Sequence, residues 1–385
     1  MIQREDIELL CSAPLRSAIE ANLGRNPSDV ALDRGVPHSS LVATQVKYLQ
    51  RAERKLPRMY KARCIIPPRA FEQCSSEECA ERKPICGDSV LDLTCGLGVD
   101  AMALAARFRR VVALERCGEL AEVVRHNFKL LGIDNVEVIN SSAEEYLAQC
   151  NERFDWVYAD PDRRSDTGHK MVCLEDCSPN ILALKSDLER VTGRVALKLS
   201  PLFDCEEALR LFPSSEVEVV SWGGECKEVN ILTNAPHPLL RTVVVGVGEW
   251  TFKPEDIGAT MHNESFQSGE WQYMIIPDVA LHKGRVAVAA LRDYASLWSN
   301  NGYGFMCTLP EVLLPGRVYA IESIEEYRPK ELKRKYKGIG ADIMKRDTSL
   351  TTDVVRRALG LKAGSEMLCA VTTIESRNWF IRLRK

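Results

Sequence analysis

The chain has 385 residues, of which 45% are hydrophobic and 27% charged, and its formal net charge is −3. This balance is typical of folded water-soluble proteins, and the length allows two or three domains with cores of their own. The first residues do not have the basic stretch followed by an apolar core that marks a signal peptide. No apolar run approaches the roughly 18 residues that a membrane span requires, so we expect neither a leader nor a membrane segment.

The fourteen cysteines are scattered along the chain. No pair has the CxxC spacing, and no cysteines and histidines cluster at zinc-binding spacing. We therefore expect no metal site, and reduced, partly buried thiols in a cytoplasmic protein.

The charge is unevenly distributed. Residues 328–385 hold 15 Lys and Arg against 6 Asp and Glu, a local balance of +9, so the rest of the chain carries −12. A basic end on an acidic body suggests an anionic partner, although a solvated basic face would give the same count.

Apolar residues recur at helical spacing over 5–23 and 41–56, which predicts a helical region over 1–70 that ends at the two prolines of "IIPPRA". From residue 85 onward, short β-type runs alternate with helical ones. The runs are 88–94, 110–115, 135–140, 154–160 and 193–200. Such alternation predicts βαβ units and a mostly parallel sheet. Two further runs, 216–221 and 228–233, are expected to pair antiparallel at the far edge of that sheet.

"NAPHPLL" (234–240) and "LLPGRVYAI" (313–321) are predicted boundaries, with an α+β stretch between them. The last residues, 343–383, predict a strand, a capped helix and two strands.

The loop after the first strand, "DLTCGLGVDA" (92–101), has two glycines at alternate positions. It does not have the Gly-Lys-Ser/Thr ending of a P-loop, which excludes that class of nucleotide site. Gly96, Gly98 and Ala101 satisfy the relaxed GxGxxA dinucleotide pattern, and Glu115 ends the next strand, where a ribose-binding acid is expected. The glycines alone therefore leave a nicotinamide cofactor open.

Asp92 favours a different cofactor. A carboxylate so close to the loop would repel a pyrophosphate, whereas the sulfonium and ammonium groups of S-adenosylmethionine would be attracted. We expect Asp92, Thr94, Gly96 and Gly98 to bind this cofactor in the loop, and Glu115 to accept hydrogen bonds from the ribose hydroxyls. Further cofactor contacts are expected at the end of the third strand and in the segment before the sheet, from Ser142 or Glu144 and from Gln73 and Ser75.

The fourth strand ends in Asp160-Pro161, at the carboxyl edge where ligands of such sheets bind. We expect Asp160 to contact both the cofactor and the group to be methylated, with Pro161 beside it. A turn-forming Asp-Pro is the alternative. The two arginines that follow, Arg163 and Arg164, could contact RNA phosphates or pair with nearby acids.

These motifs resemble those of class I S-adenosylmethionine-dependent methyltransferases, with motif I in "DLTCGLGVD", the ribose acid at Glu115 and motif IV in "DPDRR" (160–164). More narrowly, the chain resembles a bacterial family of candidate RNA methyltransferases that carry a THUMP-like C-terminal domain. The stretches that carry this likeness are "FEQCSSEECAERK", "LEDCSPNI", "KLSPLFD", "GGECKEVN" and "RPKELKRKYKG". Asp162 departs from the family, whose members usually carry a small residue at that position.

The resemblance implies an α/β fold with a Rossmann-like seven-stranded class I methyltransferase sheet. It also implies ferredoxin-like and THUMP-like α+β subdomains at the C-terminal end. The domains we expect are therefore 1–70 (helical), 71–235 (methyltransferase), 236–324 (ferredoxin-like) and 325–385 (THUMP-like). RNA would be bound by the basic residues of the last module, Lys333, Arg334, Lys335, Lys337, Arg356 and Arg357.

The predicted function is methyl transfer to a base in structured RNA, either tRNA or rRNA. An inactive scaffold that binds cofactor and RNA, and a nicotinamide-dependent oxidoreductase, are the alternatives. Carbon-5 methylation of a pyrimidine would need a cysteine nucleophile. Cys226, beside Lys227, is the candidate, and a small buried thiol is the other interpretation of the same residue. Lys198 and Glu228 are expected near the cleft without an assigned role.

Overall fold

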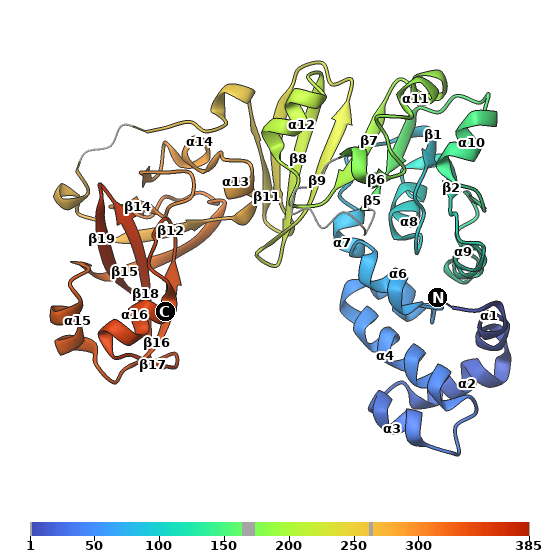
Figure 1. Cartoon of the computed structure of the whole chain (residues 1–385), viewed down its shortest axis with the longest axis horizontal. Helices are drawn as coiled ribbons and strands as arrows, with labels where there is room; N and C mark the ends of the chain where they lie inside the picture. The colour runs from blue at the N-terminus through green and yellow to red at the C-terminus, as the bar shows by residue number, and fades with distance from the viewer. Residues whose placement is uncertain (1, 164–173, 262–264, 385) are drawn as a thin grey trace. The chain divides into compact units, whose positions relative to one another are not determined.

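The computed structural model describes residues 2–163, 174–261 and 265–384 (Figure 1), and Arg164 of the predicted motif IV lies outside them. The chain forms two compact units. The first comprises residues 1–203 and 230–236, and the second comprises 204–229 and 237–385.

The first unit contains a sheet whose strand order is β9-β7-β4-β1-β2-β3, to which β9 contributes its last residues. The pairs β1–β2, β1–β4, β2–β3 and β4–β7 are parallel, as the alternation of strands and helices predicts. Asp92 is level with Ala113 of β2 and Tyr158 of β4, so the carboxyl ends of the three central strands meet at one edge. The strands are β1 (Gly87–Asp92), β2 (Phe108–Leu114), β3 (Val136–Ile139), β4 (Trp156–Ala159), β7 (Val195–Leu199) and β9 (Glu225–Thr233).

Helices connect these strands, and together with the strand order they give the predicted Rossmann-like arrangement. They are α8 (Val99–Ala105), α9 (Gly118–Leu131), α10 (Ala143–Gln149) and α11 (Lys185–Val191). Between β4 and α11 lie a short pair of strands and one turn of 3-10 helix: β5 (Asp162–Arg163), η1 (Leu174–Asp176) and β6 (Cys177–Ser178).

The N-terminal helices belong to the same unit and share a buried core with α8 and α9. The predicted helical stretch over 5–23 forms two helices, which meet at Ser12. Pro14, whose ring supplies no N–H, occupies the first turn of the second helix, where no N–H is required. The helices are α1 (Arg4–Cys11), α2 (Ala13–Asn22), α3 (Pro27–Leu32), α4 (Ser39–Lys55), α5 (Pro57–Lys61), α6 (Pro68–Gln73) and α7 (Glu77–Ala80).

Two buried amide side chains hold the segment that follows α5. Gln45 of α4 donates to the Ile66 carbonyl (3.3 Å) and accepts from the Ile66 N–H (3.0 Å). Asn127 of α9 does the same for Ile65, at 2.9 Å for both bonds. Each amide thus satisfies one residue of a buried segment that has no secondary structure of its own.

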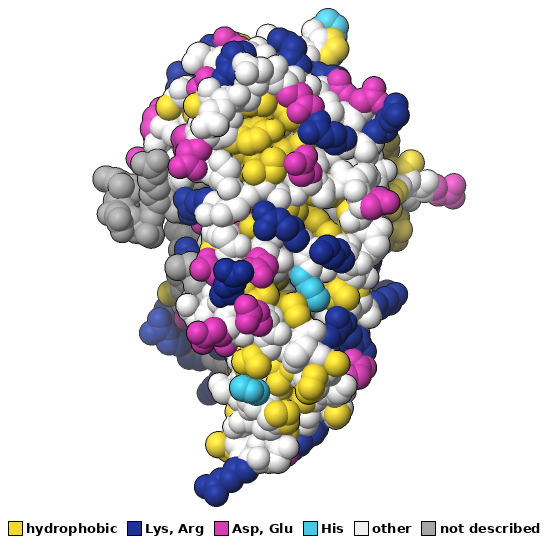
Figure 2. Space-filling model, turned by 90° about the vertical axis from the view of Figure 1, so that its right-hand side faces the viewer, with side chains coloured by type: hydrophobic (Ala, Val, Ile, Leu, Met, Phe, Trp, Pro, Cys, Tyr) yellow, Lys and Arg dark blue, Asp and Glu magenta, His cyan; other side chains and the backbone are white. Residues whose placement is uncertain are grey.

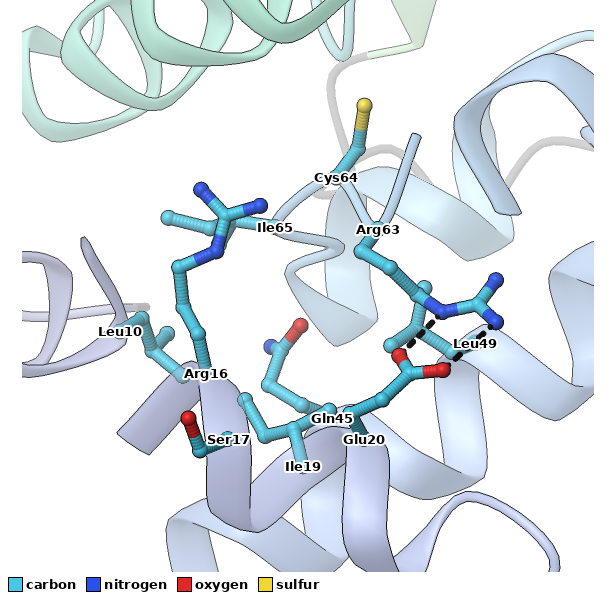
Figure 3. Close-up of a pocket in the computed structure, with 10 residues that line it drawn as sticks. All are labelled: Leu10, Arg16, Ser17, Ile19, Glu20, Gln45, Leu49, Arg63, Cys64 and Ile65. Atoms are coloured by element: carbon cyan, nitrogen blue, oxygen red, sulfur yellow. Dashed lines mark hydrogen bonds and ion pairs between the residues drawn. The ribbon is translucent and has the colours of Figure 1, made fainter. Parts of the chain in front are cut away.

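A cavity of about 270 Å³ lies beside this segment (Figure 3). Arg63 and Glu20 face each other across part of its lining and form two hydrogen bonds, 2.6 and 3.0 Å long. The other lining residues are Leu10, Arg16, Ser17, Ile19, Gln45, Leu49, Cys64 and Ile65.

The second unit begins with α12 (Cys205–Leu211) and β8 (Ser215–Trp222) and includes the first residues of β9. The prediction that 216–221 and 228–233 form the far edge of a sheet is wrong. Beyond β8 lie β10 (Leu239–Val244), paired with it in parallel, and β11 (Gly248–Phe252), antiparallel to β10. Arg241 on β10 forms ion pairs with Glu216 and Glu218 on β8. These cross-strand contacts favour the pairing of β10 with β8.

An eight-stranded sheet follows in the same unit, in the order β13-β14-β12-β15-β19-β18-β16-β17. The predicted order of strand, capped helix, strand and strand over 343–383 is confirmed by β16, α16, β18 and β19, and Thr351 caps α16. The predicted boundary after residue 324 lies inside β15. The strands are β12 (Tyr273–Pro277), β13 (Ser296–Leu297), β14 (Gly304–Met306), β15 (Gly316–Glu326), β16 (Gly340–Lys345), β17 (Lys362–Ala363), β18 (Met367–Ile374) and β19 (Arg377–Leu383).

Besides α12, the described part of this unit contains two 3-10 helices and four α-helices: η2 (Pro254–Asp256), η3 (Phe266–Ser268), α13 (Val279–Lys283), α14 (Ala287–Leu291), α15 (Pro329–Tyr336) and α16 (Thr352–Leu359). Phe266 packs edge-on against Trp298, Phe305 and Trp379, so residues far apart in the sequence share one aromatic core.

Candidate active site

The loop between β1 and α8 is shaped by its two glycines. Gly96 and Gly98 both have positive φ, +55° and +83°, where other residues are strained. A Cβ on Gly98 would lie 2.8 Å from Cζ of Phe128 and 3.0 Å from Cγ1 of Val124, both on α9. A Cβ on Gly96 would meet only the Thr94 carbonyl, at 4.0 Å. The space that a side chain would occupy is therefore filled at Gly98 and free at Gly96.

Asp92 is fully buried where β1 ends. Its Oδ1 accepts the Thr94 N–H at 2.9 Å, while Oδ2 has no hydrogen-bond partner among the described residues. Burial raises the pKa of Asp92 to about 8, an effect that the Thr94 N–H opposes. A buried carboxylate oxygen without a partner is suited to a cationic ligand.

Glu115 follows β2 and is also buried. Its Oε2 accepts the Gly96 N–H at 2.9 Å and its Oε1 accepts the Cys117 N–H at 2.8 Å. Burial raises the pKa of Glu115, and these two N–H groups oppose the rise. The acid therefore ties the glycine loop to the end of the second strand.

Asp160 follows β4, and its N–H donates to the Thr94 hydroxyl at 2.6 Å. Its side chain, 31% exposed, forms an ion pair with Lys198 of β7. Burial raises the pKa of Asp160, and Lys198 opposes that rise. Pro161 beside it is buried.

A second buried acid, Asp100, accompanies this pair. The Lys198 ammonium lies 3.6 Å from Asp100 Oδ2 and 2.9 Å from the Ser75 hydroxyl, and Ser75 donates to Asp100 at 2.9 Å. Lys83 lies 3.8 Å from the other oxygen of Asp100. Burial would raise the pKa of Asp100, but Lys198 and Lys83 outweigh it, and its pKa is lowered.

Sequence reasoning gave no role to Asp100, Lys83 or Lys198. One signal was available for Lys198, because a lysine in the apolar run "VALKL" is a charge placed in a buried strand. Asp100 and Lys83 had no comparable signal.

The remaining predicted cofactor residues make contacts within the protein. Gln73 donates to Asp162 Oδ2 at 3.1 Å. Ser142 is the N-cap of α10, where it accepts the Glu145 N–H at 3.2 Å in a capping box. Thr94 links Asp92 to Asp160 through the two hydrogen bonds above.

Cys226, the candidate nucleophile, lies in the second unit. Burial raises the pKa of its thiol to about 11, although Lys283 opposes the rise. At neutral pH the group is therefore a thiol, which is a weak nucleophile.

The predicted RNA-binding residues are mostly exposed in the second unit. Lys333, Arg334 and Lys335 lie on α15 and Lys337 ends it, while Arg356 and Arg357 lie on α16. Lys335 pairs with Glu325, and Arg356 donates to the Ala341 carbonyl at 3.2 Å.

The described residues contain no group of three or more His, Cys, Asp or Glu side chains arranged to hold a metal ion. Among the same residues, no helix combines the length and the apolar character needed to cross a membrane.

Two family models match the chain. A "Methyltransferase domain" model matches residues 90–164, and a "THUMP domain-like" model matches residues 316–385. The first match spans β1 to β5, and the second begins at β15.

Similar proteins are known in bacteria. An uncharacterized S-adenosylmethionine-dependent methyltransferase of Mycobacterium tuberculosis is 25% identical over 336 residues, which are 83% of this chain and 87% of that protein. The 23S rRNA (uracil(1939)-C(5))-methyltransferase of Vibrio parahaemolyticus is 29% identical over 183 residues, 42% of this chain and 40% of that protein. The crystal structure of a candidate methyltransferase from Porphyromonas gingivalis W83 covers 100% of this chain and 99% of that one, with 25% identity and a TM-score of 0.83.

The residues at the sheet edge fit the cofactor that these names indicate. Asp92 offers a buried carboxylate oxygen that has no partner among the described residues, and the space beside Gly96 would let a ligand approach the backbone closely. The fold, the glycine loop and the relatives agree: the chain is an S-adenosylmethionine-dependent methyltransferase with a THUMP-like domain at its C-terminal end.

Proposed function

We propose that the chain methylates a base in structured RNA, tRNA or rRNA, in the cytoplasm. The observation that carries this proposal is the Asp160–Lys198 ion pair, which follows β4 at the edge of the sheet that also holds Asp92 and Glu115. RNA is favoured because relatives are named as rRNA or tRNA methyltransferases and because the C-terminal domain is THUMP-like.

The cofactor would lie against the glycine loop, with Asp92 beside its cationic groups and Glu115 beside its ribose. When bound, it supplies an activated methyl group and its own leaving group. The chain contributes alignment and charge, because displacement at such a carbon needs little else.

Asp160 would meet the acceptor. If the acceptor is a base nitrogen, it loses a proton when its new bond to carbon forms, and a carboxylate in contact with it can take or orient that proton. Lys198 holds the carboxylate in place and favours its ionised form, the form able to accept the proton.

Carbon-5 chemistry, which the names of several relatives specify for those proteins, would require a cysteine nucleophile. The raised pKa of Cys226 does not favour that role here. We therefore propose a nitrogen acceptor and expect Cys226→Ala to remain active.

Transfer of labelled methyl from S-adenosylmethionine into total RNA from cells that lack the enzyme, followed by nucleoside analysis, tests the proposal. We expect a single labelled nucleoside from the wild type and none from Asp160→Ala, whose affinity for S-adenosylhomocysteine should stay within a few fold of wild type. Label in protein or in small molecules, with none in RNA, would refute an RNA substrate. Label at carbon-5 of uracil, lost in Cys226→Ala, would refute the nitrogen acceptor.

A further inference from the structure

A run of basic residues crosses the N-terminal helices, far in the sequence from the basic C-terminal module. Residues 47–69 contain eight Lys and Arg and one acid, Glu53. Apart from Arg63, which pairs with Glu20, these side chains form what we call the basic strip: Lys47, Arg51, Arg54, Lys55, Arg58, Lys61 and Arg69.

The helical spacing of the strip explains why it faces solvent. In α4 the buried face consists of Val42, Val46, Leu49 and neighbouring residues. Lys47, Arg51 and Arg54 alternate with these in the sequence and therefore lie on the opposite face of the helix. Five members of the strip are more than a third exposed in α4 and α5, and Arg69 is exposed in α6. The side chains of the strip are all basic, whereas basic and acidic side chains are interspersed on the face shown in Figure 2.

Few carboxylates neutralise the strip. Arg51 pairs with Glu72, and Lys55 donates to the Phe71 carbonyl at 2.6 Å. Within the part of the chain that the structure describes, no ion pair involves Lys47, Lys61 or Arg69. The strip therefore presents several exposed positive charges that an anionic partner from outside the chain could bind.

The strip is connected to the candidate active site within the same unit. Arg51 lies over the rings of Tyr48 and Phe71, at 5.3 and 5.0 Å, and so bridges α4 and α6. At its end α6 carries Gln73, which donates to Asp162. Two residues later Ser75 contacts Asp100 and Lys198. One short helix thus joins the strip to the residues around Asp160.

We propose that the basic strip is a second RNA-contacting surface, which binds the phosphates of the substrate beside the active site. The proposal rests on the proposed function, because it assumes an RNA substrate. A polyanion fits better than a small anion, since successive turns of α4 repeat the charge at Lys47, Arg51 and Lys55, and α5 adds Arg58 and Lys61. The two rings under Arg51, half-buried Tyr48 and buried Phe71, already pack against each other, so we assign the strip to phosphates and not to bases.

The test compares two triple variants. Lys47→Gln, Lys61→Gln and Arg69→Gln remove the three unpaired charges of the strip. The control, Arg109→Gln, Lys129→Gln and Lys185→Gln, removes three exposed charges elsewhere in the same unit. Affinity for the RNA that the wild type methylates is measured against salt. The strip variant should lose about 2 from the slope of log K on log salt, at about 0.7 per phosphate of a single strand, and the control much less.

S-adenosylhomocysteine affinity checks the fold of both variants and should match wild type. Equal slopes for strip and control variants, on an RNA that wild type methylates, would refute the strip and leave the proposed function intact. Failure of wild type to methylate any RNA would instead refute the proposed function. Binding to vesicles of anionic phosphatidylglycerol that is lost in the strip variant, with the RNA slope unchanged, would assign the strip to a lipid surface and overturn the proposal.

Discussion

Asp92 is a residue whose burial opposes folding at neutral pH. Its pKa is about 8 in the folded chain against an ordinary value of 3.8, so the unfolded chain loses the proton more easily. Stability should therefore fall as the pH rises from about 4 to about 8, because the folded state retains a proton that the unfolded state releases. Asp92→Asn removes this dependence.

We expect Asp92→Asn to stabilise the protein more at pH 8 than at pH 5, because the amide cannot ionise and so avoids the cost that burial places on the charged carboxyl as the pH rises. Urea unfolding at the two pH values measures it. The same variant should bind S-adenosylhomocysteine more weakly. A stabilisation that is equal at both pH values would contradict the assigned protonation.

Lys198 and Lys83 form a matched pair of residues. Both approach Asp100, but only Lys198 also contacts Asp160. In Lys198→Met the pKa of Asp160 should rise further, because burial would act without the opposing ammonium. If the ionised carboxylate is the active form, the acidic limb of the kcat profile moves to higher pH.

Lys83→Met removes a cation that lies near Asp100 and that lowers the pKa of Asp160 less than Lys198 does, so the acidic limb should move less than in Lys198→Met. The measurement is kcat against pH for both variants on the RNA that the wild type methylates. An acidic limb that moves equally in both variants would mean that Lys198 has no specific effect on the pKa of Asp160.

The sequence could place Asp92, Glu115 and Asp160 because each ends a strand, and parallel strands bring their carboxyl ends to one edge. It could not supply the network around Asp100. The contact between Ser75 and Lys198 joins residues 123 positions apart, and no local pattern encodes how such segments pack together.

At the scale of elements, the junction of β1 and α8 depends on a glycine. Gly98→Ala combines a positive φ with a Cβ only 2.8 Å from Phe128, and should cost about 2–5 kcal/mol of stability. Gly132→Ala is the control, since this residue ends α9 at φ +67° with nothing within 4 Å of the added Cβ. It should cost about 1–2 kcal/mol.

Urea unfolding of both variants measures the difference, which reports the contacts of the added Cβ with Phe128 and Val124. The double variant Gly98→Ala with Phe128→Leu should recover part of the loss if that contact is responsible. Equal costs for the two glycines would show instead that backbone strain alone decides.

Periodicity predicted the helices and strands well where a single pattern ran through an element. It did not locate the break at Ser12, since the apolar repeat continues from one helix into the next across the break that Pro14 marks. It also failed to predict that β10 and β11 extend the sheet beyond β8. Their β-type residues are equally typical of strands in a separate domain.

At the scale of the whole molecule, the basic C-terminal module should contribute to RNA affinity through phosphate contacts. Replacing Lys333, Arg334, Lys335 and Lys337 by Gln should lower the slope of log K on log salt by roughly 3, at about 0.7–0.9 per contact. S-adenosylhomocysteine affinity should be unchanged. Identical slopes for wild type and variant, measured with a folded RNA, would show that the cluster is only a solvated face.

Deleting residues 328–385 would be a poor substitute for these substitutions. β18 and β19 lie in the sheet that also holds β12 and β15, and Trp379 packs against Phe266 in the shared aromatic core. The deletion would expose that core and the edge of β15, so lost RNA binding could not be separated from unfolding.

The paired amide side chains around residues 65 and 66 have a consequence for hydrogen exchange. The N–H groups of Ile65 and Ile66 lie in no helix or strand, yet Asn127 and Gln45 bind them in the core. Each proton can exchange with solvent only when its amide partner withdraws, one with α9 and the other with α4. The exchange rate of the Ile65 N–H therefore reports how often the segment separates from α9. The exchange rate of the Ile66 N–H reports how often the segment separates from α4.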